Sequence, residues 1–186
     1  MRMWPSWANW KFCLKIVGLL FLVVYFLIHV PYVDIAWVGA YLAVALGVGA
    51  VFGLVANPIL VRLIPTQRCD PSPYGDYRVA QAKRRPWIDA LLLPGEDGFF
   101  FVPLILVGIN PITAGVTSVV YAAIHYPEFP AKFCVAKVAS LYLIATLILP
   151  QGIGSVVVGH LLLDVFAYYV WSRSASRPIA SEGNGH

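Results

Sequence analysis

Residues 15–33 read KIVGLLFLVVYFLIHVPYV, an apolar run that opens with Lys15 and contains no acidic residue. A helix that crosses a hydrocarbon core of about 30 Å needs roughly 20 mostly apolar residues. This run has that length, so it predicts a membrane-spanning helix. No small-residue cleavage site of the A-x-A type follows Val33, which favours a retained anchor over a cleaved signal peptide.

The rest of the chain has a similar composition. Of its 186 residues, 60% are hydrophobic and 12% are charged, and the mean hydropathy is +0.76. Ordinary soluble domains are about 45–50% apolar and about 25% charged. These values exclude a soluble globular domain, a disordered chain and a nucleic-acid binder. They predict an integral membrane protein with one transmembrane domain, residues 1–172, and a disordered tail, residues 173–186.

Proline and glycine divide the apolar sequence into consecutive segments. We expect an all-α, polytopic membrane helix bundle of about six transmembrane helices, with short loops between antiparallel neighbours. The expected spans are residues 15–33, 35–64, 87–110, 111–126, 132–149 and 152–171.

The basic residues agree with six spans. All 13 Lys and Arg then fall within or beside the N-terminal stretch, the 65–85 loop, the 126–131 turn and the C-terminal tail. The loops on the other side, around Asp34, Asn110 and Pro150, carry none. By the positive-inside rule, both termini face the cytoplasm, and we expect a multi-pass protein of a bacterial inner membrane. The basic residues then meet the headgroups of the lipid bilayer rather than nucleic acid.

Five carboxylate and imidazole residues at similar depth stand out within the last four expected spans. Such residues are costly inside a bilayer and are functional candidates by default. A rise of about 1.5 Å per residue places all five between mid-bilayer and the cytoplasmic third. They are Glu96, Asp97, His125, His160 and Asp164.

This set permits hydrolysis by an activated water. A glutamate in a poorly solvated pocket can take a proton from water, a histidine beside it can orient that water, and a second histidine can stabilise an oxyanion. Alternatively, two histidines with one or two carboxylates can hold a divalent metal such as zinc, and the ligands would be Glu96, His125, His160 and Asp164. Either route predicts cleavage of a peptide bond. The chain contains no HExxH motif and no serine or cysteine with a histidine partner by motif.

Three short motifs contain these residues: PGEDGFFF at 94–101, YAAIH at 121–125 and HLLLD at 160–164. In order and spacing they resemble the EExxxR, FxxxH and HxxxN/D motifs of the CAAX-protease and bacteriocin-processing (Abi) family of intramembrane proteases. The resemblance covers about residues 86–172. It implies that Glu96 is the general base and that His125 is its partner on the water. It also implies that His160 and Asp164 form an oxyanion or ligand pair supported by Asp97, and that the substrate is a peptide or membrane protein.

The chain departs from the family pattern at two positions. Asp97 replaces the second glutamate, and Phe101 stands where the motif has arginine. Lys137, Arg84 and Arg85 are the basic residues that we consider as replacements. The departures leave a second interpretation open: a non-catalytic membrane protein on the same scaffold, serving as a subunit or assembly factor of a membrane complex or as an immunity factor.

Structural alternatives also remain open for each motif. Glu96 and Asp97 follow Pro94-Gly95 and would then lie in a loop rather than in a span. His125 would be an interfacial or capping residue at a helix end. His160 and Asp164 would be a hydrogen-bonded pair that holds helices together. A transporter is less favoured, because we find no repeated halves.

Overall fold

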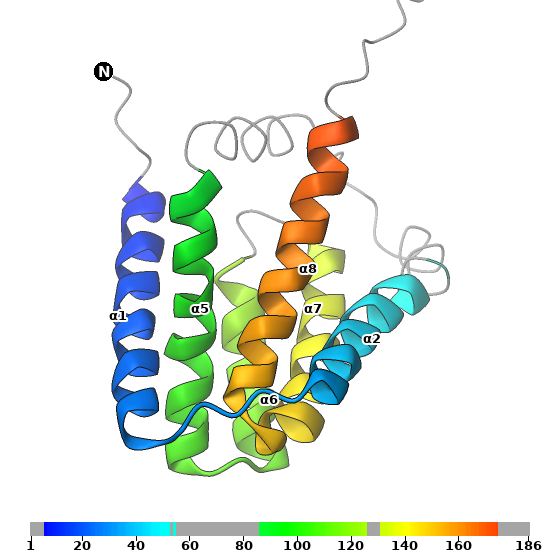
Figure 1. The fold of residues 1–186 in the computed structure, drawn as a ribbon. Coiled ribbons are helices and arrows are strands. Elements are labelled where there is room, and N and C mark those ends of the chain that lie inside the picture. The colour runs from blue at the N-terminus through cyan, green and yellow to red at the C-terminus, as the bar shows by residue number, and fades with distance from the viewer. Residues whose placement is uncertain (1–5, 53, 55–85, 126–130, 175–186) are drawn as a thin grey trace, which may run out of the picture.

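The computed structural model describes residues 6–52, 54, 86–125 and 131–174. In these residues it is all-helical, with six α-helices and no strand, as the sequence predicts. Successive helices run in alternating directions (Figure 1). They are α1 (Ser6–Ile28), α2 (Ile35–Val51), α5 (Pro86–Val107), α6 (Pro111–Ala123), α7 (Ala131–Leu143) and α8 (Ile153–Ser174).

The end of α7 departs from regular α-helix. A π-helical turn (η2, Ile144–Ile148) and a 3-10 turn (η3, Leu149–Gln151) continue the helix. Gly152 then reverses the chain with a φ of +136°, a conformation that favours glycine. A Cβ at Gly152 would also lie only 3.3 Å from the Tyr32 carbonyl oxygen, so the link between α1 and α2 packs closely on this turn.

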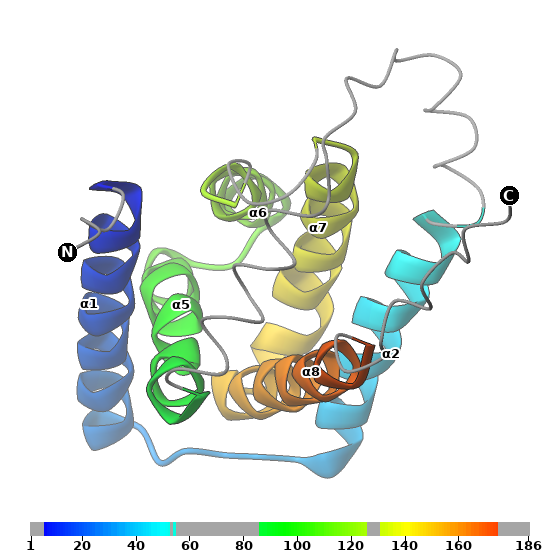
Figure 2. The same ribbon diagram turned by 90° about the horizontal axis from the view of Figure 1, so that it is seen from above.

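Five helices form a ring when the molecule is seen from above. Around it stand α5, α6, α7, α2 and α8, each in contact with the next (Figure 2). The first helix, α1, stands outside the ring against α5. The last helix, α8, closes the ring between α5 and α2, so residues far apart in the sequence meet inside it.

Three glycines let α1 and α5 approach to backbone contact. A Cβ on Gly18 would overlap the Gly95 carbonyl oxygen, and a Cβ on Gly98 would overlap the Gly18 carbonyl oxygen. A Cβ on Gly95 would overlap the carbonyl oxygen of Lys15. Close backbone approach through small residues is typical of helix pairs in lipid, where van der Waals packing replaces the hydrophobic effect. We call Gly18, Gly95 and Gly98 the glycine seam.

Side-chain caps begin two of the helices. Asp34 accepts a hydrogen bond from the Ala36 N–H at 2.8 Å and so caps α2. The Asn110 side chain accepts from the Thr113 N–H, and the Thr113 hydroxyl accepts in return from the Asn110 N–H, which makes a capping box at α6. The Asp34 N–H also donates to the Ser155 hydroxyl on α8 at 3.0 Å, which ties the start of α2 to α8.

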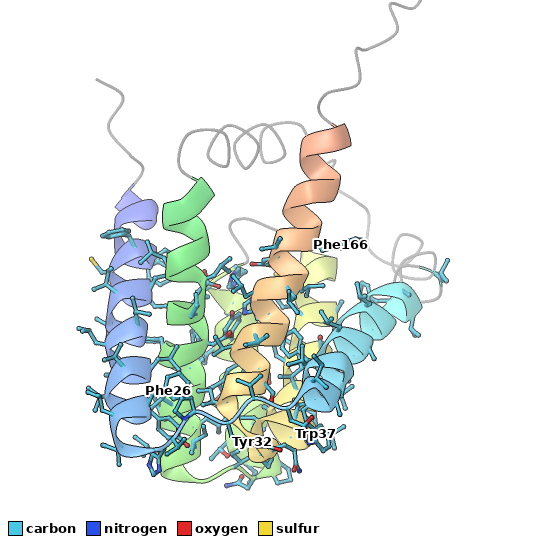
Figure 3. The ribbon with its side chains drawn as sticks, in the orientation of Figure 1. Phe26, Tyr32, Trp37 and Phe166 are labelled. Carbon is cyan, nitrogen blue, oxygen red and sulfur yellow. The ribbon has the colours of Figure 1, made fainter. Side chains whose placement is uncertain are left out.

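Large apolar side chains project outward from the bundle. Leu20, Val24 and Leu27 on α1 are exposed, and so is Phe166 on α8. Figure 3 shows such side chains around the outside of the helices, with Phe166 labelled on α8. An exposed apolar surface of this extent is typical of a protein that faces lipid.

Two helices among the described residues are long and apolar enough to cross a membrane: Trp10–Ile28 and Cys134–Gln151. This supports a membrane protein, but it does not confirm the six predicted spans. Ile35–Val51, Pro111–Ala123 and Ile153–Phe166 are apolar but shorter. The α5 helix has 22 residues and carries Glu96 and Asp97 near its middle.

The predicted bounds of the first span, residues 15–33, were wrong at both ends. The helix begins nine residues earlier, at Ser6, and ends at Ile28, shortly before Pro31, because a residue that precedes proline disfavours the helical region. Lys15 therefore lies inside α1 rather than at its start. Of the second predicted span, residues 35–64, most of the part after Val51 lies outside the described residues, as do the 65–85 loop and residues 175–186.

Candidate functional site

The two acids of the first motif lie in the middle of α5. The helix is continuous through Pro94, so the alternative that placed Glu96 and Asp97 in a loop was wrong. Both are buried, with 8% of Glu96 and 1% of Asp97 exposed. Adjacent residues of a helix point about 100° apart. Glu96 therefore meets α1 and α6, and Asp97 meets α8.

Three side chains from two helices surround the Glu96 carboxylate. The Lys15 ammonium lies 2.9 Å from Oε1. The Tyr121 hydroxyl donates to Oε2 at 3.2 Å, and His125 Nε2 lies 3.4 Å from the same oxygen. Oε1 thus faces a cation on α1, and Oε2 faces Tyr121 in the last turn of α6 and His125 just beyond its end.

The end of α6 fixes the orientation of the His125 ring. The last turn tightens, so the His125 N–H bonds to the Ala122 carbonyl rather than to the carbonyl of Tyr121. The Tyr121 carbonyl is left to accept from His125 Nδ1 at 2.9 Å. A carbonyl only accepts, so Nδ1 carries a hydrogen. In the neutral ring Nε2 is then an acceptor, and it faces Oε2 of Glu96.

Aromatic rings enclose this pair. The Tyr121 and His125 rings are stacked, with centroids 5.2 Å apart and an angle of 10° between their planes. Phe100 and Phe101 contact the Tyr121 ring at centroid distances of 4.5 and 6.2 Å. The Lys137 ammonium lies 5.1 Å from the centre of the same ring, in a cation–π contact. These mostly apolar surroundings lower the local dielectric constant and strengthen electrostatic interactions at Glu96.

The second pair joins α5 to α8. His160 Nδ1 lies 2.9 Å from Asp97 Oδ1, and His160 Nε2 lies 3.8 Å from Asp164 Oδ2 one turn further along α8. The other oxygen of Asp97, Oδ2, is buried and has no hydrogen-bond partner among the described residues. The Asp164 side chain is 34% exposed, so His160 stands between a buried carboxylate and a partly exposed one. The Tyr41 ring covers His160 at a centroid distance of 6.2 Å.

All five predicted site residues therefore have a partner in the structure, as one pair and one group of three rather than a single cluster. Glu96 pairs with His125, and Asp97 pairs with His160 and through it with Asp164. Among the described residues, no group of three or more His, Cys, Asp and Glu is placed to hold a metal ion. In the described part of the chain, the conditional zinc ligand set of Glu96, His125, His160 and Asp164 is not assembled, because Glu96 faces His125 while His160 and Asp164 lie with Asp97.

The cation beside Glu96 was not predicted from the sequence. Lys15 was assigned to topology, and Lys137, Arg84 or Arg85 were considered in place of the missing arginine. Lys137 lies over the Tyr121 ring, and the two arginines lie outside the described residues. The spacing of Lys11, Lys15, Gly18 and Leu22 would have shown that one face of the first helix carries two lysines and a glycine.

Tyr121 and Tyr41 were also missed. Tyr121 had been noted only as the first residue of its motif, with no role of its own. Tyr41 lies on α2, outside the segment that the resemblance covers, and no motif identifies it.

Comparison of the chain with protein-family models, with curated proteins and with solved structures finds no match in any of the three.

Proposed function

We propose that this protein is an intramembrane endopeptidase that hydrolyses a peptide bond with a water activated by Glu96 and His125. The observation that supports it best is the buried approach of Glu96 Oε2 to His125 Nε2 at 3.4 Å. The resemblance to CAAX proteases, which gave the same two residues as base and partner, agrees with it. The substrate class would be a peptide or a membrane-protein segment.

The chemistry follows from the hydrogen-bond capacity of the two groups. When His125 is neutral, its Nε2 and the Glu96 carboxylate are both acceptors, and two acceptors 3.4 Å apart are stabilised by a donor beside them that both can share. A water molecule has two hydrogens and can donate to both. As its oxygen attacks the carbonyl carbon, Glu96 takes one proton and can later return it to the leaving amine.

The second pair is suited to the charge that develops on the carbonyl oxygen. His160 donates to one carboxylate and reaches towards another, so it can hold and pass a proton. A histidine that donates to an oxyanion lowers the barrier to acyl transfer. Asp97 positions the ring from its buried side, and Asp164 connects it to the partly exposed side.

We further propose that all six helices cross a bacterial inner membrane, with both termini cytoplasmic. The alternating directions support this, because α1 and α5 begin and α8 ends at the same end of the bundle (Figure 1). The links at the other end, residues 29–34, 108–110 and 152, contain no lysine or arginine. The positive-inside rule then gives the orientation.

The alternative is a non-catalytic membrane subunit, assembly factor or immunity factor on the same scaffold. One observation favours it: the ion pair between Lys15 and Glu96 resembles a structural link between two helices. A partner within a membrane complex is then expected instead of a substrate.

The test is cleavage by purified protein in lipid. Wild type, Glu96→Gln and Ser118→Ala would be incubated with a diverse peptide pool, with and without a chelator, and the products identified by mass spectrometry. Ser118 is a matched control, because it is buried on α6 but donates only to the Ala114 carbonyl at 2.7 Å. We expect products from wild type and Ser118→Ala and none from Glu96→Gln. Products from Glu96→Gln at the wild-type rate would exclude Glu96 as the base. If no folded variant gives products and a membrane partner co-purifies with the protein, the alternative is supported.

A further inference from the structure

We propose that Lys15 on α1 is a positioning residue for the base Glu96. This inference rests on the proposed function, because it assigns Lys15 a part in the same hydrolysis. The ammonium binds Oε1 and leaves Oε2 as the oxygen that faces Tyr121 and His125. Lys15 does not touch the water or the substrate in this account.

The geometry restricts the carboxylate. A glutamate side chain turns about three bonds, and a single contact at one oxygen would leave the other free to swing. Here Oε1 is held at 2.9 Å by a cation, and the side chains are only 20% and 10% exposed. An ion pair shielded from water in this way is screened little. The ammonium therefore fixes which oxygen is presented to His125.

The backbone of α1 fixes the ammonium in turn. The carbonyl oxygen of Lys15 lies against Gly95, the residue before Glu96, within the glycine seam. Lys15 and Glu96 thus project from a point where the two helices are in backbone contact, and neither helix can slide without losing that contact. Although α1 stands outside the ring of helices, it completes the surroundings of the base.

The other charged or titratable groups near Glu96 come from five helices besides α1. In the described residues they are Asp97 on α5, Tyr121 on α6 and His125 just after it, Lys137 on α7, Tyr41 on α2, and His160 and Asp164 on α8. Lys15 binds a Glu96 oxygen through its ammonium at 2.9 Å, and the Lys137 ammonium lies over the Tyr121 ring.

The test compares Lys15→Met, Lys15→Arg and Lys11→Met in the full chain in lipid. Lys15→Met keeps the length of the side chain and removes the charge. Lys11→Met removes the same charge one turn earlier on α1 and so controls for an effect on membrane topology. We expect Lys15→Met to lower kcat at least tenfold with KM within twofold of wild type. Lys15→Arg should recover most of kcat, and Lys11→Met should stay within threefold of wild type.

A chemical rescue tests whether a lysine-like ammonium at position 15 is sufficient. In a background with the three cysteines replaced by serine, Lys15→Cys would be assayed before and after alkylation with bromoethylamine, which restores an ammonium on a side chain of lysine's length. We expect the alkylated protein to recover at least a third of the kcat of the background. The modified side chain has a sulfur in place of one lysine methylene and restores length and charge together, whereas Lys15→Met restores the length alone, so the two variants together separate charge from packing.

Several outcomes would overturn the inference. Lys15→Met with wild-type kcat would show that the ammonium is not needed. An equal loss in Lys11→Met, or no recovery after alkylation, would assign the effect to topology or to packing. Thermal unfolding of Lys15→Met, Glu96→Gln and the double variant reports on the ion pair whether or not the protein is a peptidase. Additive changes in Tm would disprove the pair itself. Coupled changes without any peptidase activity would overturn the proposed function and leave Lys15 a structural residue.

Discussion

The glycine seam makes a quantitative prediction for Gly18→Ala. The new Cβ would lie 2.5 Å from the Phe99 nitrogen, where ordinary contact begins at 3.4 Å, and it would overlap the Gly95 carbonyl oxygen. The helices α1 and α5 would have to separate by roughly 1 Å, and overpacking of this kind costs about 1–3 kcal/mol. The same movement would stretch the Lys15–Glu96 contact from 2.9 Å towards the limit of an ion pair.

The assay is thermal unfolding of the purified protein in one detergent, followed by circular dichroism. For a chain of this size the destabilisation corresponds to a fall in Tm of roughly 2–12 °C. Gly39→Ala is the matched control, because it lies inside α2 and a Cβ there meets no atom within 4 Å. Alanine in place of glycine inside an unobstructed helix stabilises by about 0.5–1 kcal/mol, so the control should have an unchanged or higher Tm.

The two variants thus have opposite expected signs for the same chemical change. If Gly18→Ala unfolds at or above the wild-type temperature, α1 and α5 are not in backbone contact, and the position of Lys15 beside Glu96 loses its structural basis. If both variants fall equally, the loss does not come from the seam.

Two further substitutions test other contacts of the site. Tyr121→Phe removes the hydroxyl that donates to Glu96 Oε2 at 3.2 Å, and we expect a loss of about 1–3 kcal/mol because the acceptor is charged. Its control is Tyr142→Phe, whose hydroxyl has no hydrogen bond in the described part of the chain. Equal unfolding curves for the two variants would contradict the hydrogen bond between Tyr121 and Glu96. Gly159→Ala would place a Cβ 2.6 Å from Tyr41 Cγ and displace the ring that covers His160, at a cost of about 1–3 kcal/mol. Gly115→Ala, where the nearest atom is 4.0 Å away, should be stable, and a wild-type Tm for Gly159→Ala would refute the contact.

Much of the helical architecture follows from the apolar segments and their punctuation. Pro111 predicted the start of α6 correctly, because proline suits the first turn of a helix, and the structure shows that Asn110 caps it. The start of α1 at Ser6 could not be read from hydropathy, because Trp10, Lys11 and Lys15 interrupt the apolar pattern while remaining compatible with a helix. The number of helices does not give the number of membrane crossings. By length and hydropathy, two helices in the described residues could cross a membrane.

The sequence identified five of the residues that meet in this region, but neither their pairing nor the contacts made by Lys15, Tyr121 and Tyr41. Motif order and depth identified Glu96, His125, His160 and Asp164, but a linear sequence does not show that Glu96 and its neighbour Asp97 face different helices. That division follows from the ring arrangement, in which α6 and α8 lie on either side of α5. Lys15 was assigned to topology because the positive-inside rule accounts for basic residues near the ends of spans. The rule does not distinguish a lysine at the membrane surface from one whose side chain contacts another helix.

The closing position of α8 has a consequence for biosynthesis. Asp97 enters the growing protein with α5, more than sixty residues before His160 is translated. Until α8 emerges and closes the ring between α5 and α2, the buried carboxylate has no imidazole beside it, and a nascent chain that stalls before α8 presents an uncompensated acid within its helical bundle. Because an unpaired charge is costly in an apolar environment, such truncated chains should be the ones that cellular quality control removes first.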